Sequence, residues 1–356
     1  MIVELKGKHF KALIKAVTRF PSVGNFAGAD LVNLQVVDGK ATATTFGIVL
    51  ARARVPAAGV MSLVGIERRA IESYCAYISE KSSVTIKTDG GKFVAKSGER
   101  ETTLAMDQKV AAHKLPRIKD LPQIEITEDI AARATYLADV AYNDTSRAEL
   151  CCVMLAEGGM AIAVDQTTFA VLTVATKAAN VPIPLPLAKQ LQAGDVLYLG
   201  ERETVLVSGI GTYSMPSPVK ALKDFPLALV KKLGEAKREK AAVVDGKLLA
   251  EAIGECGGVV GSLARTETII TISTSSEKRL HFAATNGGAE YKTSMPALSV
   301  KGEFVFRLPL DGVIRALPFM ADKVTMSQSE HGDLYLDIGS GWCLFPGWQD
   351  PKKRKK

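Results

Sequence analysis

Apolar and polar positions along residues 143–173 alternate in a way that predicts two strands and a tight turn. The turn falls at Glu157-Gly158-Gly159, where glycine can supply the positive φ of a hairpin. The second strand ends at Ala163-Val164-Asp165, and a polar corner, Gln166-Thr167-Thr168, precedes the next apolar run at Phe169. The same pattern recurs at residues 31–47 and 268–287. Three copies of one hairpin predict three copies of one domain.

A helix is predicted before each hairpin. In the first helix the apolar residues fall at i, i+3, i+4 and i+7 and form one face: Phe10, Leu13, Ile14 and Val17. Four cations fall on the opposite face: Lys8, Lys11, Lys15 and Arg19. One face therefore packs, and the other presents positive charge either to an anionic partner or to solvent.

The other two helices have comparable patterns. Thr127 is placed to cap the second helix, and Glu128 and Asp129 follow in its first turn, where carboxylates are favourable. Its predicted buried residues are Ile130, Ala134, Leu137 and Ala141. The third helix begins at residues 245–247, and its predicted buried residues are Leu248, Leu249, Ala252 and Ile253.

The repeat predicts an α+β fold with three similar domains. After the hairpin each copy has a second predicted helix, at residues 66–81, 185–192 and 310–317, followed by short strands with Gly-rich turns. Two helices and a long antiparallel sheet per copy predict helices on one face of the sheet. Proline and charge interrupt the pattern at residues 111–122 and 213–240. We therefore expect domains at residues 1–118, 119–240 and 241–356, each long enough for its own core.

Composition adds limits on location and on covalent chemistry. Hydrophobic residues make up 47% of the chain, yet no run approaches the roughly 18 apolar residues of a membrane span. The N-terminus has no secretion-signal pattern, so we expect a cytoplasmic protein without membrane contact. The five cysteines are never spaced as C-x-x-C, which argues against a disulfide framework and a zinc site and favours small buried side chains. They are Cys75, Cys151, Cys152, Cys256 and Cys343.

The formal net charge of +7 is concentrated at the end of the chain. Residues 352–356 are five consecutive cations, which leaves a charge of +2 for the rest. A nearly neutral body binds nucleic acid only through a local stripe of cations. The basic tail has three interpretations: a solvated end, a contact with the DNA backbone, or a nuclear-targeting signal.

The usual catalytic motifs are absent from the sequence. There is no Gly-x-x-x-x-Gly-Lys-Ser/Thr phosphate loop, no Gly-x-Gly-x-x-Gly and no Gly-x-Ser-x-Gly. The four histidines, His9, His113, His281 and His331, are scattered without ligand spacing, so neither a metal nor another cofactor is expected. Asp165 is better placed to cap its corner than to act as a general base. We therefore expect a protein that is not an enzyme.

Several short stretches resemble one protein family. They are Arg147-Ala148-Glu149-Leu150 before the central hairpin, Ala163-Val164-Asp165 at its end, Ser97-Gly98 before the strand that runs through Leu104, and Leu344-Phe345-Pro346. Together with the threefold repeat, they resemble the beta subunit of the bacterial replicative DNA polymerase, the DNA sliding clamp. The resemblance implies a head-to-tail homodimer whose six domains close a ring around duplex DNA, with the helices lining the hole. It also implies a processivity factor that tethers the polymerase and other DNA-processing proteins.

The resemblance further implies three sets of site residues. Phosphate contacts without base readout would come from Lys8, Lys11, Lys15 and Arg19. A groove between domains 2 and 3 would bind polymerase and clamp-loader peptides, lined by Leu150, Val164, Gln166, Thr167, Thr168, Phe169, Cys343, Phe345 and Pro346. The dimer contact would involve Thr102, Leu104, Val259 and Val260.

One corner departs from the family pattern. Gln166-Thr167-Thr168 replaces the usual Gly-His-Arg, which removes a cation from the groove and suggests a divergent clamp of a phage or other mobile element. Phe169 and Phe345 also fit an ordinary core, because half-buried aromatic residues serve both purposes. Two other functions stay open here: a scaffold that reuses the repeated domain without DNA, and an enzyme with an unrecognised site.

Overall fold

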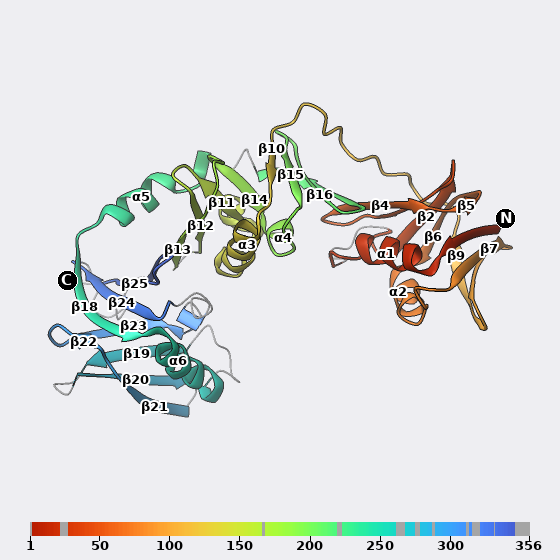
Figure 1. Cartoon of the computed structure of the whole chain (residues 1–356). Helices are drawn as coiled ribbons and strands as arrows, with labels where there is room; N and C mark the ends of the chain where they lie inside the picture. The colour runs from red at the N-terminus through yellow and green to blue at the C-terminus, as the bar shows by residue number, and fades with distance from the viewer. Residues whose placement is uncertain are drawn as a thin grey trace. The chain divides into compact units, whose positions relative to one another are not determined.

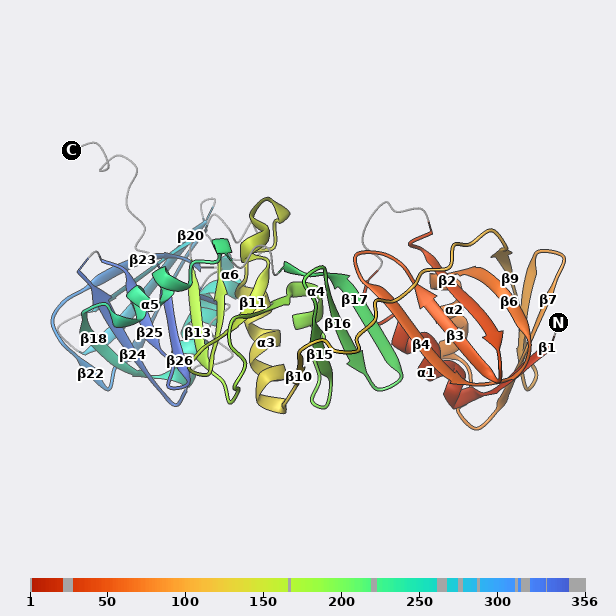
Figure 2. The ribbon, with the colours of Figure 1, turned by 90° about the horizontal axis from the view of Figure 1, so that it is seen from above.

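The computed structural model describes residues 2–21, 28–165, 168–218, 223–260, 268–274, 278–286, 289–310, 313–314, 321–330 and 332–345. The chain forms two compact units (Figures 1 and 2). The first comprises residues 1–131 and 190–220, and the second comprises residues 132–189 and 221–356. The predicted middle domain, residues 119–240, contributes to both units, and the domain boundaries near residues 118 and 240 remain predictions.

The first unit is built on one long sheet. Its helices are α1 (Gly7–Val17), α2 (Arg68–Ala76) and the start of α3 (Glu128–Val140). Its strands are β1 (Ile2–Lys6), β2 (Leu31–Val37), β3 (Lys40–Thr45), β4 (Leu50–Pro56), β5 (Ala58–Gly59), β6 (Met61–Glu67), β7 (Ser83–Asp89), β8 (Lys92–Ser97), β9 (Arg100–Asp107), β10 (Gln123–Glu125), β15 (Val196–Leu199), β16 (Glu203–Ser208) and β17 (Gly211–Pro216). Among the described residues these strands form a 13-stranded sheet in the order β10-β15-β16-β17-β4-β3-β2-β6-β9-β8-β7-β1-β5.

Helix α1 covers one face of this sheet. Phe10, Leu13, Ile14 and Val17 are all buried, which confirms the apolar face predicted from their spacing. The helix packs on β3, β4 and α2, and Figure 1 shows α1 and α2 on the same side of the strands. The helix ends where the backbone N–H and the hydroxyl of Thr18 both donate to the carbonyl oxygen of Ile14, at 3.0 and 2.9 Å.

The pairing of β4 with β17 joins the two sequence segments of the first unit. Residues 50–53 of β4 pair antiparallel with residues 214–211 of β17. In β4, Ala51, Ala53 and Val55 are buried, whereas Arg52 and Arg54 alternate with them. Because successive strand residues point to opposite faces, the arginines face away from α1.

The second unit contains two sheets. Its helices are the remainder of α3, the 3₁₀ segment η1 (Thr145–Leu150), α4 (Leu185–Ala188), α5 (Leu227–Glu235) and α6 (Gly246–Val260). Its strands are β11 (Cys152–Ala156), β12 (Met160–Val164), β13 (Phe169–Thr173), β14 (Val181–Pro184), β18 (Arg238–Asp245), β19 (Ile269–Thr274), β20 (Arg279–Asn286), β21 (Ala289–Pro296), β22 (Ser299–Val300), β23 (Val305–Pro309), β24 (Lys323–Ser329), β25 (Leu334–Asp337) and β26 (Gly341–Phe345). Within the described parts of the unit, the sheet orders are β14-β11-β12-β13-β26-β25-β24-β18-β22 and β21-β20-β19-β23.

The three predicted hairpins are present. They are β2–β3, β11–β12 and β19–β20. In the central one Gly158 and Gly159 have φ values of 82° and 69°, the conformation for which glycine was predicted. In the first one Asp38 and Gly39 are both left-handed, with φ of 51° and 72°, as a two-residue type I′ turn requires.

The helices α3 and α6 follow the predictions except at one residue. Thr127 caps α3, because its hydroxyl accepts the N–H of Ile130 at 3.2 Å, and the four predicted apolar residues of this helix are buried. In α6, Leu249, Ala252 and Ile253 are buried, but Leu248 is 39% exposed. The prediction for Leu248 was wrong because the buried stripe runs 249, 252, 253, 256 and leaves position 248 outside it.

Candidate functional site

The outward face of α1 carries three lysines. Lys8 and Lys15 are exposed, and Lys11 is half-buried, with its Nζ donating to the carbonyl oxygen of Ile78 at 3.1 Å. Lys11 and Lys15 also border a shallow pocket of about 230 Å³ between α1 and α2. This arrangement presents ammonium groups to solvent from a helix whose other face is anchored in the core, which suits contacts with phosphates.

Arg19 belongs to the same predicted set but has a different environment. It lies two residues beyond the end of α1, and its guanidinium donates to the Ser208 hydroxyl at 2.7 Å and to the carbonyl oxygen of Gln190. Asp195, only 2% exposed, lies 3.5 Å from the guanidinium. The Tyr213 ring lies 5.4 Å away. The Arg19 side chain thus ties the end of α1 to the segment that precedes β15 and to β16.

An apolar pocket lies in the second unit against β11, β12, β13, β26 and α5. Its volume is about 670 Å³. Its apolar lining includes Ala156, Met160, Ile162, Val171, Leu227, Val230 and Trp342, and its polar lining includes Glu157, Asn180, Lys231 and Glu235. We call it the groove pocket. A concave apolar surface with a few polar groups at its rim is suited to an apolar side chain of a peptide.

Several predicted groove residues belong to the apolar cluster beneath this pocket. Leu150 and Val164 are buried members of the cluster, and Phe169 is half-buried against it. Thr168 is buried, and its carbonyl oxygen accepts the N–H of Asp165 at 2.8 Å. Gln166, Thr167 and Pro346 lie outside the described residues.

The C-terminal strand presents different residues to the pocket from those predicted. In β26, Trp342 pairs with Val171 and Leu344 pairs with Phe169, so these two side chains share the pocket-side face of the sheet. Cys343 and Phe345 alternate with them, are each 1% exposed, and point to the opposite face, where Cys343 meets Tyr136 of α3. Burial raises the pKa of the Cys343 thiol to about 12. The structure therefore does not bring Cys343 and Phe345 to the groove pocket.

Helix α5 forms the other wall and is held at its C-terminal end. The Arg238 guanidinium donates to the carbonyl oxygens of Leu233 and Gly234 at 3.3 and 2.8 Å. It lies 4.0 Å from the centre of the Tyr335 ring and 5.2 Å from that of Trp342. A cation at the last carbonyls of a helix is favourable, and the two rings hold it there. The sequence pattern did not predict α5, because Leu227 and Val230 fell within an assumed domain boundary.

The predicted dimer contacts lie at an incomplete sheet edge and a helix end. β9 pairs with β8 along residues 100–105, but with β6 only at residues 106 and 107. Within the described chain, the other edge of β9 at residues 100–105 has no partner strand. Thr102 and Leu104 on this strand are half-buried. In the other unit Val259 of α6 is 53% exposed, and the side chain of Val260 lies outside the described residues.

Metal-ligating clusters and membrane-spanning helices are both absent from the described residues. No group of three or more His, Cys, Asp or Glu residues is arranged to hold a metal ion in that part of the chain. None of the described helices is both long and apolar enough to cross a membrane.

The fold is that of the bacterial DNA sliding clamps, which confirms the α+β architecture expected from the sequence. The beta subunit of DNA polymerase III from Pseudomonas aeruginosa matches with a TM-score of 0.78 at 14% identity, over 98% of this chain and 100% of that chain. The beta subunit from Thermotoga maritima matches with a TM-score of 0.79 at 12% identity, over 98% and 99%. The Helicobacter pylori beta clamp bound to a DNA ligase peptide matches with a TM-score of 0.74 at 11% identity, over 98% and 100%. No protein-family model and no curated protein sequence matches the chain.

Proposed function

We propose that this protein is a DNA sliding clamp, a processivity factor without catalytic activity that encircles duplex DNA and tethers a polymerase to it. The observation that carries the proposal is the likeness to sliding clamps along 98% of the chain. A protein with this role works in the cytoplasm and is built from three clamp domains, at residues 1–118, 119–240 and 241–356.

The encircled duplex is bound through α1. Lys8, Lys11 and Lys15 contact phosphates, because ammonium groups on the outward face of a helix bind phosphates without reading the base sequence. Arg19 adds positive potential at the end of this face, but its guanidinium is largely engaged by Asp195 and Gln190. Contacts restricted to phosphates allow a ring to move along any sequence.

The groove pocket binds a linear peptide of a polymerase or a clamp loader. An apolar side chain of the peptide enters between α5 and β13, against Trp342 and Val171. The crystal structure of the H. pylori clamp bears a peptide of DNA ligase, which supports a peptide as the occupant of this surface. Affinity is then concentrated in one or two anchoring side chains.

Two copies close the ring as a homodimer. The support is the open edge of β9, because an unpaired strand edge is a template for pairing with another chain. The second copy contributes its α6 end with Val259 and its sheet edge β21. This contact is heterologous, because different surfaces of the two copies meet. Two identical contacts of this kind close the ring and leave no β9 edge exposed.

Topological retention on DNA tests this proposal. Dimers are dissociated, then reassembled in the presence of a nicked circular plasmid, so that rings close around DNA without a loader. Gel filtration should show protein that stays on the circle at moderate salt and leaves when a restriction enzyme linearises it. Equal release from circular and linear plasmid would contradict encirclement.

A matched pair of variants then tests the assignment of α1. K8E/K11E/K15E should abolish retention, and removal of each phosphate contact should lower the slope of log K against log salt by about 0.9. K87E/K92E/K96E makes the same change in net charge on exposed lysines of β7 and β8, and it should leave retention unchanged.

A further inference from the structure

A second group of cations lies on the opposite face of the 13-stranded sheet from α1. It starts with residues 108–122, the connector between β9 and β10. Val110, Leu115 and Ile118 of the connector are half-buried, and a Cβ on Gly65 of β6 would collide with Val110, so the segment lies against the sheet. Figure 1 shows it on the side of the strands away from α1 and α2, and Figure 2 shows it crossing in front of the strands.

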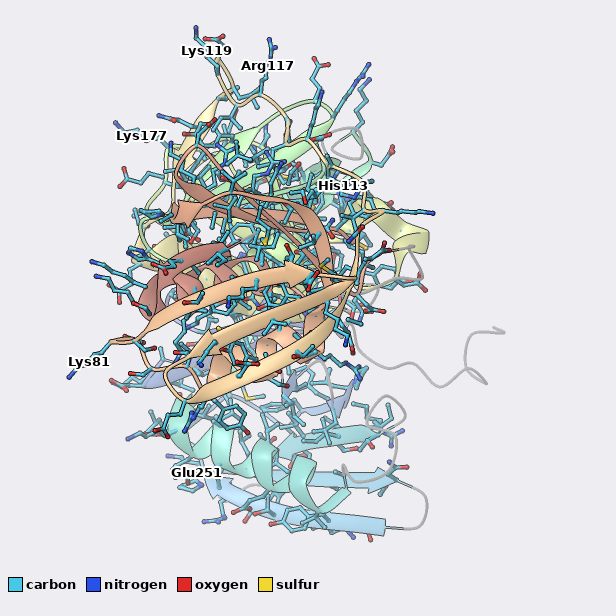
Figure 3. All side chains as sticks on the ribbon, turned by 90° about the vertical axis from the view of Figure 1, so that its right-hand side faces the viewer. Lys81, His113, Arg117, Lys119, Lys177 and Glu251 are labelled. Carbon is cyan, nitrogen blue, oxygen red and sulfur yellow. The ribbon has the colours of Figure 1, made fainter. Side chains whose placement is uncertain are left out.

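Packing of the apolar side chains leaves the cations of the connector in solvent. They are Lys109, Lys114, Arg117 and Lys119, and all four are exposed. Figure 3 shows Arg117 and Lys119 pointing outward from the connector. At no more than about 3.5 Å per residue, Lys114 lies within about 10 Å of Arg117, and Arg117 within about 7 Å of Lys119. The four cations therefore lie close to one another along the connector.

β4 adds two arginines to the same face. Arg52 and Arg54 point away from α1, and the Arg52 guanidinium donates to the carbonyl oxygen of His113 in the connector. Burial, and then the neighbouring charge of Arg54, lower the pKa of Arg52. The surface formed by the connector and β4 thus holds six cations against two carboxylates, Asp107 and Asp120, at the ends of the connector. This excess of four is large for a chain whose net charge is +7.

An aromatic pair accompanies these cations. The His113 and Phe46 rings are stacked, with centroids 4.1 Å apart and an angle of 3° between the planes. Both residues are half-buried, so the pair has solvent-exposed surface beside the Arg52 guanidinium. A row of cations next to aromatic rings is the combination by which proteins hold single-stranded nucleic acid, since phosphates meet the cations and bases stack on the rings.

We propose that the connector and the outward face of β4 bind a single strand of nucleic acid. An acidic protein segment would satisfy the cations, but it would make no use of the stacked rings. The site goes beyond the proposed function, because the sheet separates it from the α1 face that contacts an encircled duplex. A clamp with this second surface holds a single strand on its outside while a duplex passes through.

Fluorescence anisotropy with a labelled 20-nucleotide oligo-dT tests the proposal on the full chain. K114E/R117E/K119E should weaken binding by about tenfold or more, and removal of each phosphate contact should reduce the salt slope by about 0.7. K87E/K92E/K96E, with the same change in net charge, should stay within about twofold of the parent. K8E/K11E/K15E should also retain oligonucleotide binding, which separates this site from the proposed pore. The neutral triple K114Q/R117Q/K119Q serves if charge reversal impairs folding, as judged by thermal melting.

The contribution of the rings is tested with an abasic oligonucleotide of equal length. The parent should bind oligo-dT more tightly than the abasic strand, and His113→Ala should reduce that preference. The proposal is overturned if K114E/R117E/K119E and K87E/K92E/K96E weaken oligonucleotide binding equally. A second result would also overturn it: the parent binds oligo-dT and the abasic strand equally, and polyglutamate displaces the oligonucleotide when both are present at the same concentration of negative charges. The surface would then bind acidic proteins.

Discussion

At the scale of single residues, four cations that look equivalent in the sequence have unequal roles in the structure. Lys8 and Lys15 are free to meet an anion, whereas the Arg19 guanidinium is enclosed by groups that are distant in sequence. Gln190 lies 171 residues further along the chain. Helical periodicity places a side chain on a face of its own helix, but it contains no information about a partner so remote. The enclosure of Arg19 was therefore beyond prediction from the local pattern.

Removal of Arg19 should destabilise the first unit. In Arg19→Met the carboxylate of Asp195 loses its cation while it remains buried, so the free energy of unfolding should fall by about 3 kcal/mol. Urea unfolding measures this, with Lys15→Met as the control, for which a change within about 0.5 kcal/mol is expected. Arg19→Met/Asp195→Asn should recover part of the loss. Equal midpoints for the two single variants would show that the ion pair is not stabilising.

The thiols should be poorly reactive in the folded protein. Burial raises the pKa of Cys75 and Cys256 to about 11 and that of Cys152 to about 12, from an ordinary value of 9.0. A raised pKa keeps the thiol protonated at pH 8 and depletes the reactive thiolate. Titration with a disulfide reagent at pH 8 should label the half-buried Cys151 first and the buried thiols only after urea is added. Rapid labelling of all five would contradict the burial.

The same shifts give stability a pH dependence with a definite sign. Between pH 9 and about 11, the unfolded thiols of Cys75 and Cys256 lose their protons while the folded ones keep theirs. The folded state then binds more protons than the unfolded state, so the free energy of unfolding falls as pH rises. Urea midpoints measured from pH 8 to pH 11 should decline, and Cys75→Ala/Cys256→Ala should decline less. An equal decline in both proteins would show that other groups cause it.

At the scale of elements, periodicity predicted α1, α3 and the hairpins, but it did not predict the face of β26. The side-chain period of a strand is two, so an error of one residue in register moves every side chain to the other face. The resemblance implied Cys343 and Phe345, whereas the pairing of Trp342 with Val171 places Trp342 and Leu344 on the pocket side. Only the pairing of β26 with β13 in the sheet shows which of these two pairs of side chains faces the pocket.

Substitutions in β26 should separate binding from folding. Trp342→Ala should weaken binding of the polymerase peptide proposed for the groove pocket by about 1–3 kcal/mol, because it removes a wall of that pocket. Phe345→Ala should instead lower the free energy of unfolding by about 3–5 kcal/mol and leave the affinity of the folded protein unchanged. Calorimetry and urea unfolding measure the two effects. If Phe345→Ala weakened peptide binding and Trp342→Ala lowered only the stability, Phe345 would line the pocket instead.

At the scale of the whole molecule, the fold persists where sequence identity has fallen to 11–14%. The order of buried and exposed positions is sufficient to specify helices and strands, because cores accept many apolar residues of suitable volume. This is why the sequence pattern predicted the architecture. The groove wall on α5 is set by tertiary contacts instead, and local patterns did not predict it.

The open edge of β9 predicts a homodimer. Leu104→Glu places a charge beside this edge and should shift the protein to monomers in sedimentation velocity at micromolar concentration, because a buried unpaired charge opposes association. Lys96→Glu on the neighbouring strand β8, an exposed position, should leave the dimer intact. Circular dichroism checks that both variants are folded. Dimers of unchanged strength in Leu104→Glu would place the contact elsewhere.

The junction of β4 and β17 has a mechanical consequence. Backbone hydrogen bonds, the Arg19–Asp195 pair and the bond from the Tyr213 hydroxyl to the carbonyl oxygen of Ala16 all cross it. Bending at the β4–β17 junction would break several of these interactions at once, so the first unit is expected to be rigid at this point. In the proposed ring, the hinge that opens to admit DNA therefore lies outside this junction, and so does most of the elastic work of opening.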